Sequence, residues 1–245
     1  SRVDWGAQLQ GKPAQLSCRG LSRVLDHAVD DLTITVEAGL SLAELQSTLA
    51  EQDQWLPVDW PRGTDPAQPE SAGSIGGLVA RGLAGGLRQR HLGIRDQLIG
   101  IGLLRPDGTH ARAGGRVVKN VAGYDLMRLL CGSWGSLALI TELTLRVQPV
   151  RPAHSALHLR GDLRDLEACR AALMRSSLSP ERCDWCGAHD GVFELRLRVS
   201  SISDQAVETQ LNRLEALALG LHLHRGVGRA RAGRLGGLRV QQSRL

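Results

Sequence analysis

The chain has 245 residues, 42% of them hydrophobic, which is enough to bury the core of one large domain or of two modest ones. Its formal net charge is +5, almost all of its cations are scattered arginines, and aromatic residues make up only 3% of it. Nucleic-acid-binding proteins usually combine a basic stripe with stacking aromatic side chains, so this composition argues against nucleic acid as a partner.

No run of residues approaches the roughly 20 apolar residues that a transmembrane helix needs. The N-terminus also lacks the apolar segment of a signal peptide. The five cysteines are odd in number and unevenly spaced, which is typical of a reducing compartment and not of a disulfide framework. We therefore expect a cytoplasmic protein, which partner proteins could hold at the inner membrane.

The first predicted elements are a strand, a turn and a helix. Residues 32–36 form a short β-branched strand, and Ser41 with Glu44 makes a capping box for a helix that reaches about residue 52. A second short strand, residues 55–58, leads into residues 60–70. The three prolines of this last segment exclude a helix interior and a central strand, so we expect a surface loop.

Residues 71–86 are rich in glycine. Ser74 can cap a helix whose first turn contains Gly76 and Gly77. Glycines at a helix N-terminus let main-chain N–H groups approach an anion, which the helix dipole also favours, so a phosphate or pyrophosphate would suit this segment. The alternative is that the small residues only allow close packing of the helix. The spacing matches neither a Walker loop nor a Rossmann fingerprint.

Residues 97–104 and 109–113 are predicted strands joined by an Arg-Pro-Asp-Gly turn. They lead into residues 114–147, which place five glycines between two apolar runs. Asp125 caps a short helix that Gly132 can end, and the segment closes with a strand over residues 137–147. Because ordered glycines cost chain entropy, this cluster indicates main chain brought close to something bulky, such as a bound cofactor.

Residues 151–224 are predicted to form a second unit with the order strand, helix, strand, helix. Residues 155–160 and 192–199 alternate polar and apolar side chains, and the helices begin at Asp162 and at Ser203 or Asp204. Residues 225–245 are rich in glycine and arginine and lack periodicity, so we expect a loose tail.

Cys183 and Cys186 form the one CxxC pair. Such a pair can be a redox couple or half of a zinc or iron–sulfur site, but no second pair and no thioredoxin-like context accompany it. We interpret the two residues as loop thiols. The histidines of this half of the chain are separated from one another, and we predict no metal site.

Several motifs of the first half follow one another in a characteristic order. They are the capping box, Ser-Ile-Gly-Gly (residues 74–77), Gly-Ile-Arg-Asp (93–96), the Asp-Gly hairpin, GGRVVKNVAGYD (114–125) and GSWGSLALITELTLRV (132–147). This series resembles the FAD-binding domain of the vanillyl-alcohol-oxidase and D-lactate-dehydrogenase superfamily, and within it most resembles the smaller flavin-binding subunit of bacterial glycolate oxidase. The resemblance covers residues 1–150. It implies an α+β fold: a partial PCMH-type FAD-binding domain, followed over residues 151–224 by a small α+β cap-like region.

The resemblance implies FAD as the cofactor and assigns residues to its site. The pyrophosphate would be held by Gly73, Ser74, Ile75, Gly76 and Gly77. Gly93, Arg95 and Asp96 would lie near the flavin or the ribityl chain, and main chain around Ile140 would flank the adenine. Lys119, Asn120, Gly123 and Tyr124 would stand near the cofactor or shape its pocket, and Gly135 completes the cofactor-binding set.

Each assignment has a structural alternative. Tyr124 would only fill the core, Lys119 would be a solvated surface charge, and Arg95 and Asp96 would pair with each other at the surface. His91 could instead be the position of a covalent flavin link, as in some relatives. The family's first pyrophosphate loop, which normally lies just upstream of a Trp-Gly sequence like that at Trp5, is missing, so we expect an N-terminally truncated chain.

The resemblance implies an FAD-dependent subunit of a glycolate-oxidase-like enzyme, which oxidises a small 2-hydroxy acid to a 2-oxo acid by hydride transfer to flavin. Its partners would be a larger FAD subunit and an iron–sulfur subunit, and it could be inactive alone. The matched motifs contain no identifiable general base, so the catalytic residues stay unknown. One alternative is a non-catalytic scaffold that stabilises a catalytic flavoprotein partner. Another is a nucleotide-binding module without redox chemistry.

Overall fold

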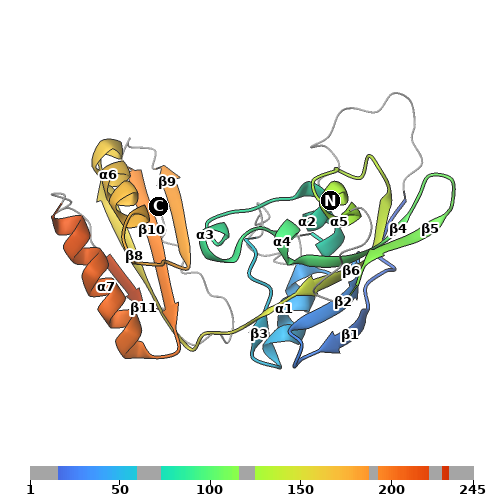
Figure 1. Cartoon of the computed structure of the whole chain (residues 1–245), viewed down its shortest axis with the longest axis horizontal. Coiled ribbons are helices and arrows are strands. Elements are labelled where there is room, and N and C mark those ends of the chain that lie inside the picture. Colours follow the sequence, from blue (N-terminus) through green and yellow to red (C-terminus); the bar gives the residue numbers. More distant parts are fainter. Residues whose placement is uncertain (1–15, 60–72, 116–124, 188–192, 221–227, 232–245) are drawn as a thin grey trace. The chain divides into compact units, whose positions relative to one another are not determined.

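The computed structural model describes residues 16–59, 73–115, 125–187, 193–220 and 228–231 (Figure 1). The chain divides into two units, residues 1–150 and residues 151–245. Each unit has its own sheet and its own cluster of buried apolar side chains, so each is described separately below. The mixture of helices and sheets is the α+β class that the sequence predicted.

An antiparallel sheet of five strands, in the order β1-β2-β6-β4-β5, organises the first unit. Short helices pack against one of its faces, and β3 pairs with β7 in a separate two-stranded sheet. The elements of the unit are β1 (Val24–Ala28), β2 (Thr33–Glu37), α1 (Leu42–Ala50), β3 (Gln54–Trp55), α2 (Ile75–Arg81), α3 (Arg88–His91), α4 (Ile94–Gln97), β4 (Leu98–Leu104), β5 (His110–Gly114), α5 (Leu126–Leu130), β6 (Leu139–Arg146) and β7 (Gln148–Pro149).

Local sequence signals account for most of these boundaries. Ser41 Oγ accepts a hydrogen bond from the Glu44 amide, and the Glu44 carboxylate accepts one from the Ser41 amide, so the predicted capping box at the start of α1 is confirmed. Ser74 and Asp125 cap α2 and α5 through their side chains, which accept from the Gly77 and Arg128 amides. β1 was missed because its sequence, VLDHA, lacks clear alternation, and the predicted strand at residues 55–58 is wrong beyond Trp55.

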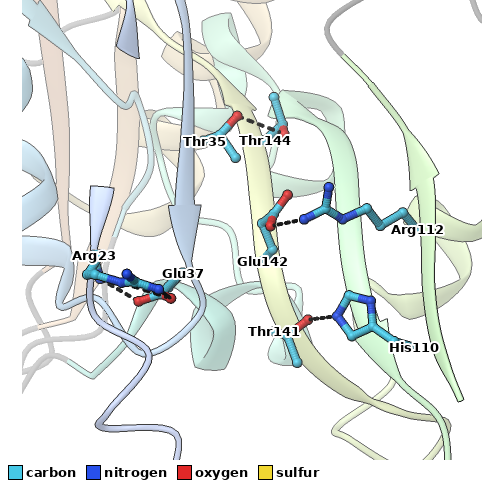
Figure 2. A network of polar contacts seen from close by, with 8 residues as sticks. All are labelled: Arg23, Thr35, Glu37, His110, Arg112, Thr141, Glu142 and Thr144. Atoms are coloured by element: carbon cyan, nitrogen blue, oxygen red, sulfur yellow. Dashed lines mark hydrogen bonds and ion pairs between the residues drawn. The ribbon is translucent and has the colours of Figure 1, made fainter. Parts of the chain in front are cut away.

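The sheet of the first unit has one apolar and one polar face. Ile34 and Val36 point into the core with side chains of α1 and α2, and Thr35 between them points away. On the polar face Thr35 Oγ1 lies 3.0 Å from Thr144 Oγ1 of β6, as Figure 2 shows. Arg112 of β5 donates to Glu142 of β6 at 2.6 Å on the same face. The helices of the first unit therefore pack against only the apolar face of the sheet, within the described residues.

Glu37 is a buried carboxylate at the end of β2. Arg23 hydrogen-bonds to it through its backbone amide and its guanidinium, at 2.8 Å in each case, and these bonds lower the pKa of Glu37 (Figure 2). A buried carboxylate is tolerated only when such partners replace water. The contact therefore fixes the chain entering β1 against the end of β2.

In the second unit a four-stranded antiparallel sheet, in the order β11-β8-β10-β9, is covered on one face by two helices (Figure 1). Apolar side chains of β8 and β10 pack against both helices, among them Leu157, Leu197, Leu166 and Leu211. The elements are β8 (Ala153–Gly161), α6 (Leu163–Met174), β9 (Arg182–Gly187), β10 (Phe193–Ser201), α7 (Asp204–Leu219) and β11 (Gly228–Arg231).

Two predictions for this unit are wrong. Cys183 and Cys186 lie on strand β9 and not in a loop, and β11 lies inside the predicted loose tail. Both strands complete the sheet by pairing with longer strands that the sequence did predict. Among the described residues, no helix is long and apolar enough to cross a membrane.

Charged side chains gather on the helix-free face of this second sheet. Glu194, which is buried, accepts hydrogen bonds from Arg196 Nε at 2.7 Å and from His158 Nδ1 at 3.1 Å, and Arg160 lies 3.6 Å away. Burial acts to raise the pKa of Glu194, but the Arg196 hydrogen bond and the three neighbouring cations outweigh it and hold that pKa below its usual range.

This arrangement predicts how the stability of the protein depends on pH. A carboxylate with a lowered pKa in the folded state stabilises that state above its unfolded pKa of about 4.3. The stabilisation is lost as the pH falls through the lower folded pKa. We expect Glu194→Gln to reduce the free energy of unfolding by about 1–3 kcal/mol at neutral pH.

Denaturant unfolding followed by circular dichroism from neutral pH to about pH 3 measures this difference. The gap between the wild type and Glu194→Gln should shrink in acid, because protonated Glu194 loses its ionic contacts. A gap that stays constant across that range would contradict the stabilising role of the ionised carboxylate.

Candidate functional site

The segment between β2 and α1, residues 38–41, connects β6 with the start of α2. The Ala38 amide donates to the Thr141 carbonyl of β6 at 2.9 Å, and the Ala38 carbonyl accepts from the Gly76 amide at 2.8 Å. The Ile75 amide donates to the Leu40 carbonyl at 2.9 Å. Two segments of the predicted cofactor site, residues 73–77 and the start of β6, are therefore held together by hydrogen bonds to the same short segment of main chain, which contains Ala38 and Leu40.

Gly76 is needed for close packing. A Cβ added to it would lie 2.7 Å from both the Cβ and the carbonyl oxygen of Ala38, a separation that real Cβ atoms do not tolerate. Gly76 is also buried, so it offers little surface to a ligand. At this position the close-packing alternative accounts for the glycine.

The amides at the start of α2 are already used by the chain itself. Ile75 and Gly76 donate to the two carbonyls of residues 38–41, and the Gly77 amide donates to Ser74 Oγ at 3.2 Å. An anion would need to compete with these bonds for the same donors. The structure thus differs from the sequence-based interpretation, in which these N–H groups point at the anion.

Among the described residues, nothing clashes with a Cβ placed on Gly73 or Gly77. A Cβ on Gly77 would make only ordinary contacts, the nearest at 3.4 Å from Ser74 Oγ. Gly73 has a φ of +91°, a left-handed conformation that favours glycine, and its Cβ would meet nothing closer than 3.7 Å. These two glycines, and not Gly76, can let a bulky group approach the main chain.

The turn at residues 133–136 lies against the second half of α2. The Gly132 amide donates to the Val79 carbonyl at 3.0 Å, and the Trp134 amide donates to the Ala80 carbonyl at 2.8 Å. Gly135 has nothing within 4 Å of its Cβ position. Trp134 is 53% exposed and has a φ of +56°, a strained conformation for a bulky side chain. Sequence analysis did not include Trp134 in the site.

Helix α4 brings Gly93, Arg95 and Asp96 to the same region. The Asp96 carboxylate accepts from the Gly93 amide at 3.1 Å and forms no ion pair with Arg95, so the predicted alternative pairing of these two side chains is wrong. Burial raises the pKa of the Cys131 thiol. The charge of Arg95 acts to lower this pKa and that of Asp96 acts to raise it, so α4 lies near the end of α5. Residues of α2, α4 and the 133–136 turn thereby converge.

A small pocket lies at the start of α4. Within the described residues it is a shallow surface hollow that encloses no space for even a water molecule, so it is not by itself a ligand pocket. His91 nearby packs edge-on against Trp55, with ring centroids 5.5 Å apart. The residues that line the pocket are Pro57, Val58, Asp59, Leu83, Ala84, Gly85, Leu87, Arg88, Leu92, Gly93 and Ile94.

The predicted adenine-flanking segment begins β6. The side chain of Ile140 is buried in the core, so only its main chain can meet a ligand. Thr141 follows it and lies 3.4 Å from His110 Nε2 of β5 (Figure 2). The other predicted residues, Lys119, Asn120, Gly123 and Tyr124, lie outside the described residues.

The two cysteines of β9 point to opposite faces of their sheet, because side chains alternate along a strand and they are three residues apart. Cys183 packs against the core, and burial raises the pKa of its thiol. Cys186 pairs with Glu194 in the register of the sheet. The pair therefore cannot close a disulfide or hold one metal ion between its two thiols.

A family model described as an FAD binding domain matches residues 6–114, which include the start of α2 and α4. Residues 6–114 are thus similar to this family of FAD-binding domains. FAD is accordingly the cofactor that the family indicates. The resemblance to a PCMH-type FAD-binding domain is confirmed for this part of the chain.

Relatives and solved structures agree with this family. Glycolate oxidase subunit GlcE of Escherichia coli (strain K12) is 36% identical over 169 residues, which cover 69% of this chain and 45% of the relative. A mitochondrial D-lactate dehydrogenase (cytochrome) of Arabidopsis thaliana is 36% identical over 137 residues, 56% of this chain and 22% of the relative. Glycolate oxidase subunit GlcD of Bacillus subtilis (strain 168) is 32% identical over 130 residues, 53% and 26% respectively.

In structure, the chain is similar to alkyldihydroxyacetonephosphate synthase, with a TM-score of 0.68 and 17% identity over 87% of this chain and 45% of the synthase chain. This likeness shows the fold. The chain spans less than half the length of the first curated relatives it matches.

The described residues around α2 are compatible with part of an FAD. Gly73, Gly77 and Gly135 leave surface uncovered by any Cβ, and they belong to segments that backbone hydrogen bonds hold together. The amides at the start of α2 already donate to acceptors within the chain, so they do not offer free donors to a pyrophosphate. Contact with the cofactor would instead be made by the main chain of the glycines, which lack a side chain.

The two adjacent glycines of α2 give a matched pair of variants. Gly76→Ala should lower the free energy of unfolding by about 1–3 kcal/mol, because the added methyl group overpacks against Ala38. Gly77→Ala should leave stability unchanged or raise it by up to about 1 kcal/mol, because alanine favours a helix. It should nevertheless weaken FAD binding, because the methyl group occupies the open surface.

Denaturant unfolding and FAD titration measure the two effects. Gly187→Ala in the second unit, where a Cβ would meet none of the described residues within 4 Å, is the control and should change neither. Equal FAD affinity in Gly77→Ala and wild type would show that the cofactor does not approach this surface.

The geometry of β9 predicts that Cys183 and Cys186 hold no metal ion between them. Metal analysis of the purified chain should find zinc and iron far below one equivalent, with no change in Cys186→Ser. One equivalent of either metal, lost on that substitution, would contradict the strand geometry.

Proposed function

We propose that the chain is the FAD-binding part of an oxidoreductase that oxidises a small 2-hydroxy acid to a 2-oxo acid. The observation that carries this proposal is that the 133–136 turn is hydrogen-bonded to α2, at whose start Gly73 and Gly77 could each be given a Cβ without a clash among the described residues. Helices α2 and α4 lie in the part of the chain that matches the FAD-binding domain model, and the turn follows that part in sequence. The choice of substrate class rests on relatives whose names are those of glycolate oxidase subunits and of D-lactate and D-2-hydroxyglutarate dehydrogenases.

The chain contributes position and electrostatics to this reaction. FAD, when bound, supplies the hydride acceptor. Gly73 and Gly77 would let the cofactor approach the main chain, and the main chain of Ile140 would flank its adenine. Arg95 and Asp96 would lie near the flavin end. The described residues offer no clear general base for the hydroxyl proton of the substrate.

We further propose that the chain works in a complex. Two of its relatives are named as subunits of glycolate oxidase, and this supports a larger FAD subunit as a partner. An iron–sulfur subunit would then carry the electrons away. We expect such a complex in the cytoplasm or on the inner face of the membrane.

One observation favours a second candidate, a non-catalytic scaffold for a flavoprotein partner. The amides that would face a pyrophosphate at the start of α2 are satisfied by the chain itself, so the helix start is stable without a ligand. In that case the domain would keep its shape and its interface without binding FAD.

A binding and reduction experiment distinguishes the two. The chain is incubated with FAD and desalted, its visible spectrum is recorded, and small 2-hydroxy acids such as glycolate and D-lactate are added without oxygen. We expect retained flavin bands close to one equivalent, and bleaching of these bands by at least one acid when the larger subunit is co-expressed.

The outcomes separate binding from catalysis. Retained flavin that no acid bleaches, with or without the partner, would contradict the oxidoreductase and leave a nucleotide-binding module. A colourless chain that still forms a complex with the partner would support the scaffold instead.

A further inference from the structure

Arg81 ends α2, and its side chain turns back along the helix toward the first turn. Its Nε donates to the Gly77 carbonyl at 3.2 Å. Its Nη2 lies 3.6 Å from the position of a Gly77 Cβ and 3.7 Å from that of a Gly73 Cβ. The guanidinium group therefore stands beside the two glycines of this segment that leave open surface.

A pyrophosphate needs charged partners that the helix start does not supply. The amides of Ile75, Gly76 and Gly77 already have acceptors within the chain. A guanidinium group presents five N–H donors in a planar fork that matches phosphate oxygens, and hydrogen bonds between ionised groups are about twice as strong as neutral ones. Arg81 brings such a donor to this surface.

Arg95 was predicted as a cation of the site, and Arg81 was not, but Arg95 acts at another place. Its charge acts on the Cys131 thiol, and Cys131 Sγ is 3.7 Å from the Cβ position of Gly82, at the C-terminal end of α2. The seven residues of α2 span about 10 Å. The Arg81 guanidinium thus lies beside the first turn of α2, whereas Arg95 lies near its C-terminal end.

We propose that Arg81 binds the pyrophosphate of the dinucleotide, which rests on the Cβ-free surface of Gly73 and Gly77. This inference rests on the FAD binding of the proposed function and deepens it. It names a side chain, outside the glycine-rich turn itself, as the main electrostatic contact of the diphosphate. Ligands that contain a diphosphate should depend on Arg81, and ligands that lack one should not.

The test compares ligands with and without a diphosphate. FAD, ADP, riboflavin and adenosine are titrated against the wild type, Arg81→Gln and Arg81→Lys, with Arg105→Gln as a control. Arg105 lies in the β4–β5 turn, where it pairs with Asp107 at 2.9 Å and is exposed. Circular dichroism and unfolding midpoints establish that each variant is folded.

We expect Arg81→Gln to weaken FAD and ADP binding by a similar factor, roughly 10- to 100-fold, as for the loss of a charge-assisted contact. Riboflavin and adenosine should bind as in the wild type. Arg81→Lys keeps the charge without the fork and should show a smaller loss. Added salt should weaken FAD binding to the wild type more than to Arg81→Gln.

Three results would overturn the inference. The first is unchanged FAD and ADP affinity in a folded Arg81→Gln protein, which leaves the proposed function standing. The second is an equal loss for riboflavin, which indicates a disturbed fold. The third is a wild-type chain that binds neither FAD nor ADP, which removes the proposed function as well. Arg81-dependent binding of ADP without binding of FAD would support the diphosphate contact and contradict only the flavin function.

Discussion

The first unit depends on the contact between Ala38 and Gly76. Through its two backbone groups Ala38 links β6 to α2, and Gly76 allows the approach because it has no Cβ. Every predicted cofactor segment that the structure describes is positioned relative to α2: residues 73–77 at its start, the 133–136 turn along its second half and α4 beside it. A methyl group at one position would therefore shift the frame on which the site is built, although Gly76 itself offers little surface to a ligand.

Sequence patterns predicted the elements whose signals are local. Capping boxes, the hairpin turn and alternating strands depend on residues a few positions apart, so α1, the β4–β5 hairpin, β8 and β10 were found. Short edge strands such as β9 and β11 were missed, because their pairing comes from a neighbour distant in sequence. The family motifs predicted an FAD site around α2, but they could not separate Gly76, which packs against Ala38, from Gly77, where a Cβ would fit without a clash. That distinction depends on Ala38, almost 40 residues earlier.

In the second unit, a metal-binding sequence motif lies on a strand, where its two side chains cannot meet. Cys183 and Cys186 have the spacing of a metal-binding pair, yet that spacing brings thiols together only on a turn or a helix. On β9 one thiol joins the core, and the other joins a face rich in arginine and histidine. Glu194 organises that face because two arginines and a histidine surround one buried carboxylate. The chemistry of the second unit is therefore carried by the polar face of its sheet and not by its cysteines.

Trp134 has a consequence of its own. Its backbone is held in a left-handed conformation by a hydrogen bond to α2, and its indole is about half exposed to solvent. A change in the position of α2 would be transmitted directly to this ring, whose emission depends on the polarity around it. Trp134 is thus an intrinsic optical reporter hydrogen-bonded to the helix that organises the site, and a variant that lacks Trp134 separates its signal from that of the other four tryptophans.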